Sequence, residues 1–515
     1  MRPGDRSAYR RAMSRSDLTY GAQRAGRAVT GALIRWPAWA YGACAVFAAL
    51  VAVFAGYEPE RIWGRCAAVG YGCAAAAALT LRRRPRAREI TLAVALAGAV
   101  LVPLAWLAAA SLDMPEVGVV QRAAALLIAH GRLYQTSGAL AGEHLVYGYD
   151  PYLPLMMVFG LPHALFGPAL WTDPRVWDAV VFAVSVTVAL RVAGTTAILT
   201  ARPRSFVRWA AVLVAWPVIA YPLAVSGNDL PVLGLVCLGL AFAGPGRPGA
   251  APRPVAAGLA LGLAAAMKAI AWPALLVVGI VFAMRDGRRA VARFAWPAAA
   301  VLAVTAGPVL ATEPVALIQN TIMFPLGLTK TVSTAASPLP GHLLADIGPA
   351  GHAVAIALLI AVAMVLAATL ALRPPRGVPA AVGYLATALT LMFALAPNSR
   401  YGYFVYPLGL GAWLWLTRIP GRRPGRPPER GRSEREPSGD EPSERGHVDH
   451  DGFLRRPGDD DHGVGVRRLV LLAVRHVRRY PHVVARSGFQ PGQVPGGGVA
   501  EDEHRVARHH VDARL

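Results

Sequence analysis

Residues 110–152 read ASLDMPEVGVVQRAAALLIAHGRLYQTSGALAGEHLVYGYDPY and lie between two long apolar parts of the chain. Asp113 and Glu116 follow directly after an apolar run that ends at residue 110. An acid at the end of a membrane helix reaches water at the bilayer surface and can still touch a lipid-borne molecule. The segment therefore indicates a membrane protein with an enzyme-like site at the surface of the bilayer.

The composition favours the same class of protein. Hydrophobic residues make up 55% of the 515-residue chain and charged residues 16%, with a mean hydropathy of +0.41. A soluble globular protein of this length would carry fewer apolar residues. The net charge of +22 does not indicate nucleic-acid binding, because the basic residues lie in short loops beside apolar runs and in the C-terminal tail. The positive-inside rule explains that distribution.

Apolar runs long enough to cross a hydrocarbon core of roughly 30 Å recur along the chain. We expect an all-α polytopic membrane protein with about twelve transmembrane helices, an outer-face loop, interfacial helices and both termini in the cytosol. The expected spans are 36–56, 63–81, 90–110, 176–199, 206–226, 229–245, two short helices within 255–284, 294–312, 350–372, 378–396 and 401–418.

The positions of the arginines indicate which loops lie in the cytosol and which lie outside. The segments expected in the cytosol are the loops 82–88, 246–254, 285–293 and 373–376 and the arginines Arg202, Arg204 and Arg208. The segments expected outside are 111–150, 313–349 and 396–400. The proline-broken segment 151–171 is expected to lie in the outer interface without crossing. A helix break near Lys268 is expected to place its ammonium towards the outer face.

Three parts of the chain follow from this pattern. Residues 1–35 form a basic cytosolic segment, and residues 36–418 form the transmembrane domain. Residues 419–515 form a basic cytosolic tail that is rich in Pro, Arg, Glu and Ser at its start and is expected to be disordered.

The sequence predicts neither disulfides nor a metal site. The four cysteines, Cys44, Cys66, Cys73 and Cys237, all fall inside apolar runs and lack metal-ligand spacing. No cofactor is expected, and no acidic pair demands a divalent cation.

The order of features resembles the GT-C superfamily of integral-membrane glycosyltransferases, and more narrowly the actinobacterial family 87 alpha-mannosyltransferases. The segments that carry this resemblance are Asp113 after an early helix, HGRLY at 130–134, YDPYLPL at 149–155, GLALGLAAAMKAIAWPALLV at 258–277 and APNSRYGYFVYP at 396–407. The chain departs from the pattern in two places. It reads YDPY where such enzymes often show tandem prolines, and Met114 and Pro115 follow Asp113 in place of a second acid.

The resemblance implies transfer of a hexose, mannose in the narrower family, from a polyprenyl-phosphate donor to a glycan or glycolipid outside the cell membrane. Asp113 is then the candidate general base, with Glu116 as the alternative, and Lys268 and Arg400 are candidates for binding the carrier phosphate. The other candidate substrate-binding residues are Arg122, His130, Tyr149, Asp150, Asn228, Asp229 and Tyr401.

Structural roles compete with these assignments. Asp113 and Glu116 equally fit the wet end of a helix, Lys268 and Arg400 fit anchors in the headgroup region, and Asn228 and Asp229 fit an N-cap better than a binding site. Tyr401 fits an interfacial aromatic belt. The alternative functions are a transporter or lipid-carrier flippase and a non-catalytic GT-C-like subunit. A transporter favours inverted repeats and charges at mid-bilayer, whereas the charges here gather at one face.

Overall fold

The computed structural model describes residues 37–136, 140, 148–193, 211–244, 251–329, 331, 333 and 335–417. All of them belong to the first of two compact units, residues 1–430. The second unit, residues 431–515, lies outside the described residues. The same holds for the expected N-terminal segment, for the tail from residue 419 and for Arg202, Arg204 and Arg208.

The first unit is built from helices, and its described residues form no strand. Its longer helices are α2 (Pro37–Phe54), α3 (Glu58–Thr80), α4 (Ala87–Leu96), α5 (Val102–Ala109), α9 (Pro174–Val192), α12 (Pro217–Val225), α13 (Leu230–Ala243), α14 (Pro254–Met267), α15 (Trp272–Arg285), α16 (Arg288–Thr312), α19 (Pro349–Leu372), α20 (Val378–Leu395) and α21 (Val405–Thr417). Five helical runs are long and apolar enough to cross a membrane: α3, Ala87–Ala109, α16, α19 and α20. The expected all-α polytopic architecture is confirmed, and each of the twelve expected spans contains a helix.

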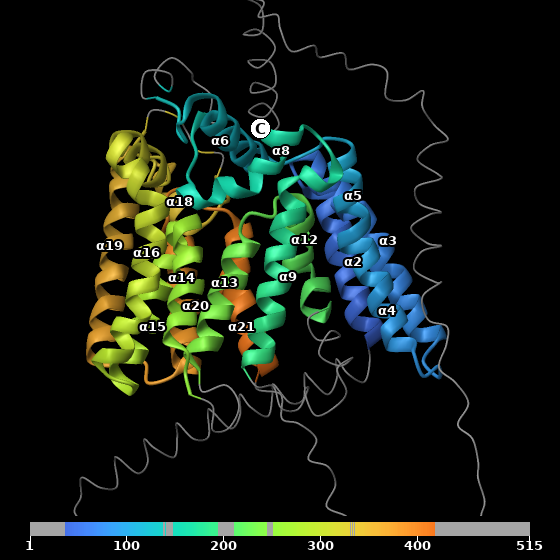
Figure 1. Ribbon diagram of the computed structural model, residues 1–515. Helices are drawn as coiled ribbons and strands as arrows, with labels where there is room; N and C mark the ends of the chain where they lie inside the picture. Colours follow the sequence, from blue (N-terminus) through green and yellow to red (C-terminus); the bar gives the residue numbers. More distant parts are fainter. Residues whose placement is uncertain are drawn as a thin grey trace, which may run out of the picture. The chain divides into compact units, whose positions relative to one another are not determined.

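Three further helices are α6 (Pro115–His130), α8 (Leu161–Phe166) and α18 (Pro340–Ala345). Figure 1 shows α6 and α8 at the upper end of the long helices. Residues 151–171 contain the 3-10 helix η3 (Pro154–Gly160), the six-residue α8 and a final 3-10 turn, η4 (Leu170–Thr172). Three short elements in place of one long helix fit the expectation that residues 151–171 do not cross the membrane.

Two expected loops contain helical residues. The basic segment at 285–293 is a tight turn at Gly287, with φ 78°, followed directly by the start of α16. Arginine is a good helix former and its long side chain can reach water from a helix, so a charged sequence need not end a helix. The outer loop at 313–349 contains α17 (Pro314–Ile318), the π-helical turn η6 (Gln319–Met323) and α18.

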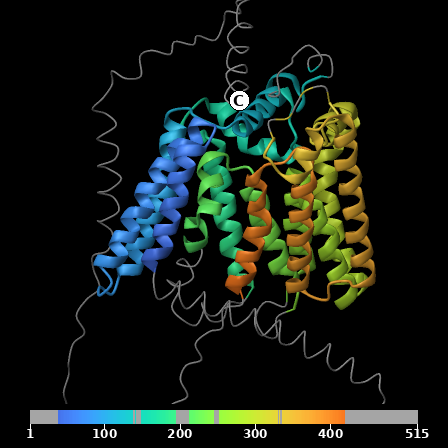
Figure 2. The ribbon, with the colours of Figure 1, turned by 180° about the vertical axis from the view of Figure 1, so that it is seen from behind.

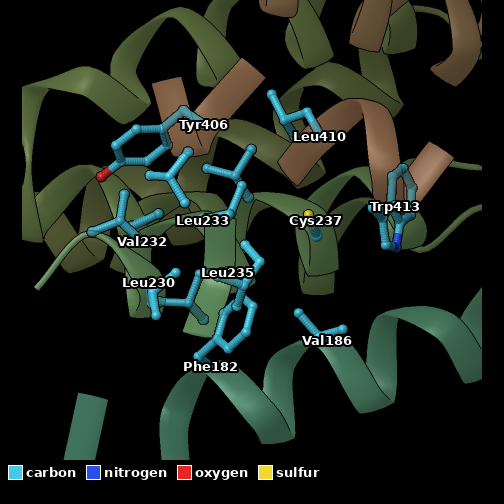
Figure 3. Packing of buried hydrophobic residues seen from close by; sticks show 14 of the residues in the cluster. Phe182, Val186, Leu230, Val232, Leu233, Leu235, Cys237, Tyr406, Leu410 and Trp413 are labelled. Carbon is cyan, nitrogen blue, oxygen red and sulfur yellow. The ribbon is translucent and has the colours of Figure 1, made fainter. Parts of the chain in front are cut away.

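α13 is the central helix of the unit. Almost every residue of α13 is buried, and a helix that is apolar all round belongs in the interior. Phe182 and Val186 of α9 pack on one side of it, and Leu410 and Trp413 of α21 pack on another (Figure 3). Because α13 begins directly after Asp229, this packing fixes the position of that acid.

The N-terminal helices α2 to α5 lie on one side of the central helices, opposite α16 and α19 (Figures 1 and 2). Between α4 and α5 the chain forms the π-helical turn η1 (Ala97–Leu101). Pro103 has no N–H to donate to the Ala99 carbonyl four residues before it, and the Trp63 Nε1–H donates to that carbonyl at 2.8 Å. The tryptophan therefore satisfies a backbone acceptor at this helix irregularity.

α3 and η1 approach each other through glycine. A Cβ atom on Gly70 would lie 2.5 Å from the Gly98 Cα, whereas a Cβ on Gly72, two residues further along α3, would meet nothing within 4 Å. Small residues allow this close backbone contact between helices that lack a hydrophobic driving force in lipid.

Gly70→Val should therefore destabilise the protein by about 1–3 kcal/mol, the usual cost of overpacking a tight interface. Thermal unfolding in detergent micelles measures the effect, with Gly72→Val as the matched control on the same helix. Equal unfolding temperatures for the two variants would contradict the proposed glycine contact.

Candidate active site

The site lies where α13, α14 and α21 come to a common end. α14 ends at Met267, and after the 3-10 turn η5 (Ala269–Ala271) the chain continues as α15, with Pro273 in the first turn of that helix, where a proline costs no hydrogen bond. Lys268 is extended there, with φ −146° and ψ 136°. The backbone N–H of Leu153 donates to the freed Met267 carbonyl at 2.9 Å. The expected break near Lys268 is confirmed, and the YDPYLPL segment packs against it.

Lys268 forms an ion pair with Asp229. Its Nζ lies 2.5 Å from the Asp229 Oδ1, and the two side chains are 11% and 15% exposed. The Tyr406 hydroxyl donates to the same carboxylate oxygen at 2.9 Å. The Lys268 ammonium also lies 4.7 Å from the centroid of the Tyr152 ring, within cation–π range. Four elements of the chain thus contribute to one nearly buried charge cluster.

Glu116 and Arg400 form a second ion pair beside the first. Their side chains are 23% and 20% exposed and belong to α6 and to the residue before the 3-10 turn η7 (Tyr401–Phe404). The buried Asn228 donates from Nδ2 to the Glu116 carbonyl at 3.0 Å. Asn228 directly precedes Asp229, so two consecutive residues contact the two ion pairs: Asn228 bonds to the backbone of Glu116, and Asp229 pairs with Lys268.

Asp113 differs from these paired acids. It is exposed and lies in the short connection between α5 and α6. Partial desolvation raises the pKa of its carboxyl, and the nearby Arg175 guanidinium opposes that rise. Of the two candidate bases, Asp113 is the one that no described ion pair neutralises, since Glu116 pairs with Arg400.

Asp150 anchors the YDPY segment. Its Oδ1 accepts the Tyr152 N–H at 2.9 Å, and its own backbone N–H donates to the Asn320 Oδ1 at 2.8 Å. Burial raises the pKa of the Asp150 carboxyl to about 7, although the Tyr152 N–H and the charges of Arg122 and Lys268 oppose the rise. This acid therefore holds the loop that carries Tyr152 beneath the Lys268 ammonium.

The other predicted binding residues are spread more widely. His130 ends α6, roughly 21 Å along the helix axis from Glu116, so the structure does not bring it to the ion pairs. Tyr149 is buried and stacked on Phe324, with ring centroids 4.5 Å apart, which makes it a packing residue. Tyr401 is exposed, and its hydroxyl lies 3.4 Å from the Pro338 carbonyl.

The expected capping role of Asp229 is wrong. It occupies the N-cap position of α13, but its side chain makes no capping hydrogen bond and pairs with Lys268 instead. An ammonium within an apolar helical unit needs a counter-charge more than a helix end needs a side-chain cap. Asn228 likewise donates across the site to α6.

The sequence interpretation missed several buried polar residues. Tyr406 and the Asp173–Arg175 pair lie at this end of the unit, and Arg175 is 1% exposed. Asp178 is fully buried, and neither of its carboxylate oxygens has a partner among the described residues. The sequence Asp-Pro-Arg at residues 173–175 is typical of a helix start, and it could have drawn attention to Asp173 and Arg175. The described ranges contain no cluster of three or more His, Cys, Asp or Glu residues arranged to hold a metal.

The raised pKa of Asp150 makes stability depend on pH. In the fold the carboxyl stays neutral up to about pH 7, whereas it ionises near its ordinary value of 3.8 once unfolded. Its contribution is therefore complete below the ordinary pKa and lost as the pH rises through 7. Asp150→Asn keeps the acceptor oxygen without the charge and should flatten the fall in thermal stability between pH 4 and 8.

Thermal unfolding in detergent at several pH values measures this effect. Glu58→Gln is the control, because the Glu58 side chain is 49% exposed and pairs only with arginines among its described ion pairs. A wild-type profile that Asp150→Asn leaves unchanged would contradict the assignment.

Comparison with known proteins finds no matching family model and no matching curated protein. Two solved structures of ArnT from Cupriavidus metallidurans are similar to the chain, one bound to undecaprenyl phosphate and one in the apo state. Their TM-scores are 0.39 and 0.36, with 21% and 20% sequence identity. Each match covers 60% of this chain and 56% of the ArnT chain, so the chain spans little more than half the length of that protein.

Proposed function

We propose that the chain is a membrane glycosyltransferase of the GT-C type. In this proposal it moves a hexose, mannose in the narrower form, from a polyprenyl-phosphate donor to a glycan or glycolipid on the extracytoplasmic face of the cell membrane. The observation that carries the proposal is the exposed Asp113 at the same end of an apolar helical unit as the Lys268 and Arg400 cations.

Asp113 is the proposed general base. It takes the proton from the acceptor hydroxyl as that oxygen forms the new bond to the anomeric carbon of the sugar. The bond between the anomeric carbon and the phosphate oxygen breaks, and the lipid phosphate leaves with one more negative charge. An ion-paired Glu116 is the weaker candidate, because protonation of its carboxylate would break the pair with Arg400.

Lys268 and Arg400 are the proposed phosphate-binding residues. Both sit at helix breaks near the end of the unit, where a lipid headgroup and a helix end can meet. Each already holds a carboxylate, so a phosphate binds by exchange with Asp229 or Glu116. A leaving phosphate carries more charge than either carboxylate, and the two cations therefore favour the transition state over the resting state.

Transfer should depend on the Asp113 carboxylate. Asp113→Asn should lower the rate of sugar transfer by about 10²- to 10⁴-fold, the usual contribution of a general base. Purified protein in lipid nanodiscs, with radiolabelled polyprenyl-phospho-mannose and a glycolipid acceptor, measures that rate. Asp286→Asn is the matched control, since that acid sits in the turn between α15 and α16 and pairs with Arg285.

A wild-type rate of sugar transfer by Asp113→Asn would show that Asp113 is not the general base. Movement of the labelled lipid across the bilayer without transfer would favour a flippase. Neither transfer nor movement would favour a non-catalytic subunit.

Donor binding should depend on Lys268. Lys268→Met should raise the KM for the labelled donor and lower kcat, with a combined loss in kcat/KM of about 10²- to 10³-fold. The same assay measures both constants, and Arg289→Met near the start of α16 is the charge-matched control. A variant with wild-type KM and kcat would contradict phosphate binding by Lys268.

A further inference from the structure

Arg175 is a buried arginine in the first turn of α9 and makes contacts in two directions. Its Nε and Nη2 donate to the two carboxylate oxygens of Asp173 at 2.9 and 2.7 Å. Its Nη1 donates to the backbone carbonyl of Leu112 at 3.0 Å. The first contact is a two-bond ion pair of fixed geometry, and the second reaches the residue directly before Asp113.

The connection that carries Asp113 is held in an unusual backbone shape. Ser111 has φ 51°, and it is the only non-glycine residue with positive φ in the described part of the chain. The Leu112 N–H donates to the Leu107 carbonyl at 2.9 Å, and the Ser111 N–H donates to the Ala108 carbonyl at 3.3 Å. These bonds end α5 in a left-handed turn. A serine is less stable than a glycine in that conformation. The Arg175 bond to the Leu112 carbonyl adds a further contact that favours the turn.

The charges that face Asp113 come from two neighbouring elements. Arg175 and Asp173 belong to α9 and its cap, and His163 belongs to α8. Arg175 lowers the pKa of Asp113 more than Asp173 raises it, and His163 contributes a smaller lowering. The nearest acid on α6, Glu116, is paired with Arg400.

We propose that Arg175 is a positioning residue for Asp113, which it holds at the site by clamping the Leu112 carbonyl from the start of α9. Asp173 is the second member of this device, because it fixes the guanidinium plane. The catalytic meaning of the device rests on the proposed function, but the clamp itself does not.

The test reads the ionisation of Asp113 directly. The protein in nanodiscs is treated with a water-soluble carbodiimide and an amine over a pH series, and amide formation at the exposed Asp113 is followed by peptide mass spectrometry. Only the protonated carboxyl reacts, so the midpoint of labelling follows the pKa and needs no enzymatic activity.

Two variants should move this midpoint in opposite directions. Asp173→Asn removes a negative charge and should lower it, whereas the double variant Asp173→Asn with Arg175→Met also removes the dominant positive charge and should raise it. The double variant avoids leaving Asp173 buried and unpaired. Identical midpoints in the two variants and the wild type would overturn the proposal, as would shifts of the same sign.

Arg175→Lys separates charge from clamp. It keeps the positive charge but cannot bind Asp173 and Leu112 together with a single ammonium. Its labelling midpoint should stay near the wild-type value, while kcat for transfer falls about 10- to 100-fold and the KM for the donor is unchanged. A wild-type kcat in Arg175→Lys would overturn the clamp.

The two proposals fail separately. If the labelling midpoints shift as expected while the wild type transfers no sugar, the proposed function fails and the charge contact between Arg175 and Asp113 stands. If the wild type transfers sugar and the midpoints are identical, the clamp fails and the proposed function stands.

Discussion

The Lys268–Asp229 ion pair is the interaction on which the rest of the site depends. An ammonium in an apolar helical unit is costly unless a counter-charge and hydrogen bonds surround it. Asp229 from the start of α13, Tyr406 from α21 and the Tyr152 ring together supply that surrounding. Each of these partners comes from a different element. The contacts that stabilise the Lys268 ammonium therefore require four elements to meet at one point.

The fold delivers these partners through helix ends. α14 ends at Met267, and the Met267 carbonyl accepts the Leu153 N–H of the segment that carries Tyr152. Burial of α13 on nearly all sides fixes Asp229 at its start. Irregular backbone at such a place is tolerated in a membrane protein only where its polar groups find protein partners.

Hydropathy and arginine position were enough to predict most of the helices. They were also enough to predict the break at Lys268 and the interruption of the apolar segment 151–171, because both features depend on local sequence. Charged helix starts were missed at α16, since a hydropathy pattern treats arginine as loop. The distance between His130 and Glu116 follows from the helical rise alone. Multiplying the rise by the number of residues between them would have shown that His130 lies far from Glu116.

The sequence did not predict which charged residues pair with each other. Asp229 and Lys268 are 39 residues apart, and Glu116 and Arg400 are 284 residues apart. Each pairing is decided by how whole helices pack, and neither helix periodicity nor loop charge encodes it. The same reason explains why Asp229 was expected to cap α13 and why the contact between Arg175 and Leu112 was not foreseen.

An electron cryo-microscopy structure of the protein in nanodiscs with undecaprenyl phosphate would show whether the phosphate replaces the two carboxylates. We expect density for the phosphate within hydrogen-bond distance of Lys268 and Arg400, with Asp229 and Glu116 no longer paired to them. A phosphate bound elsewhere, with both ion pairs intact, would contradict it.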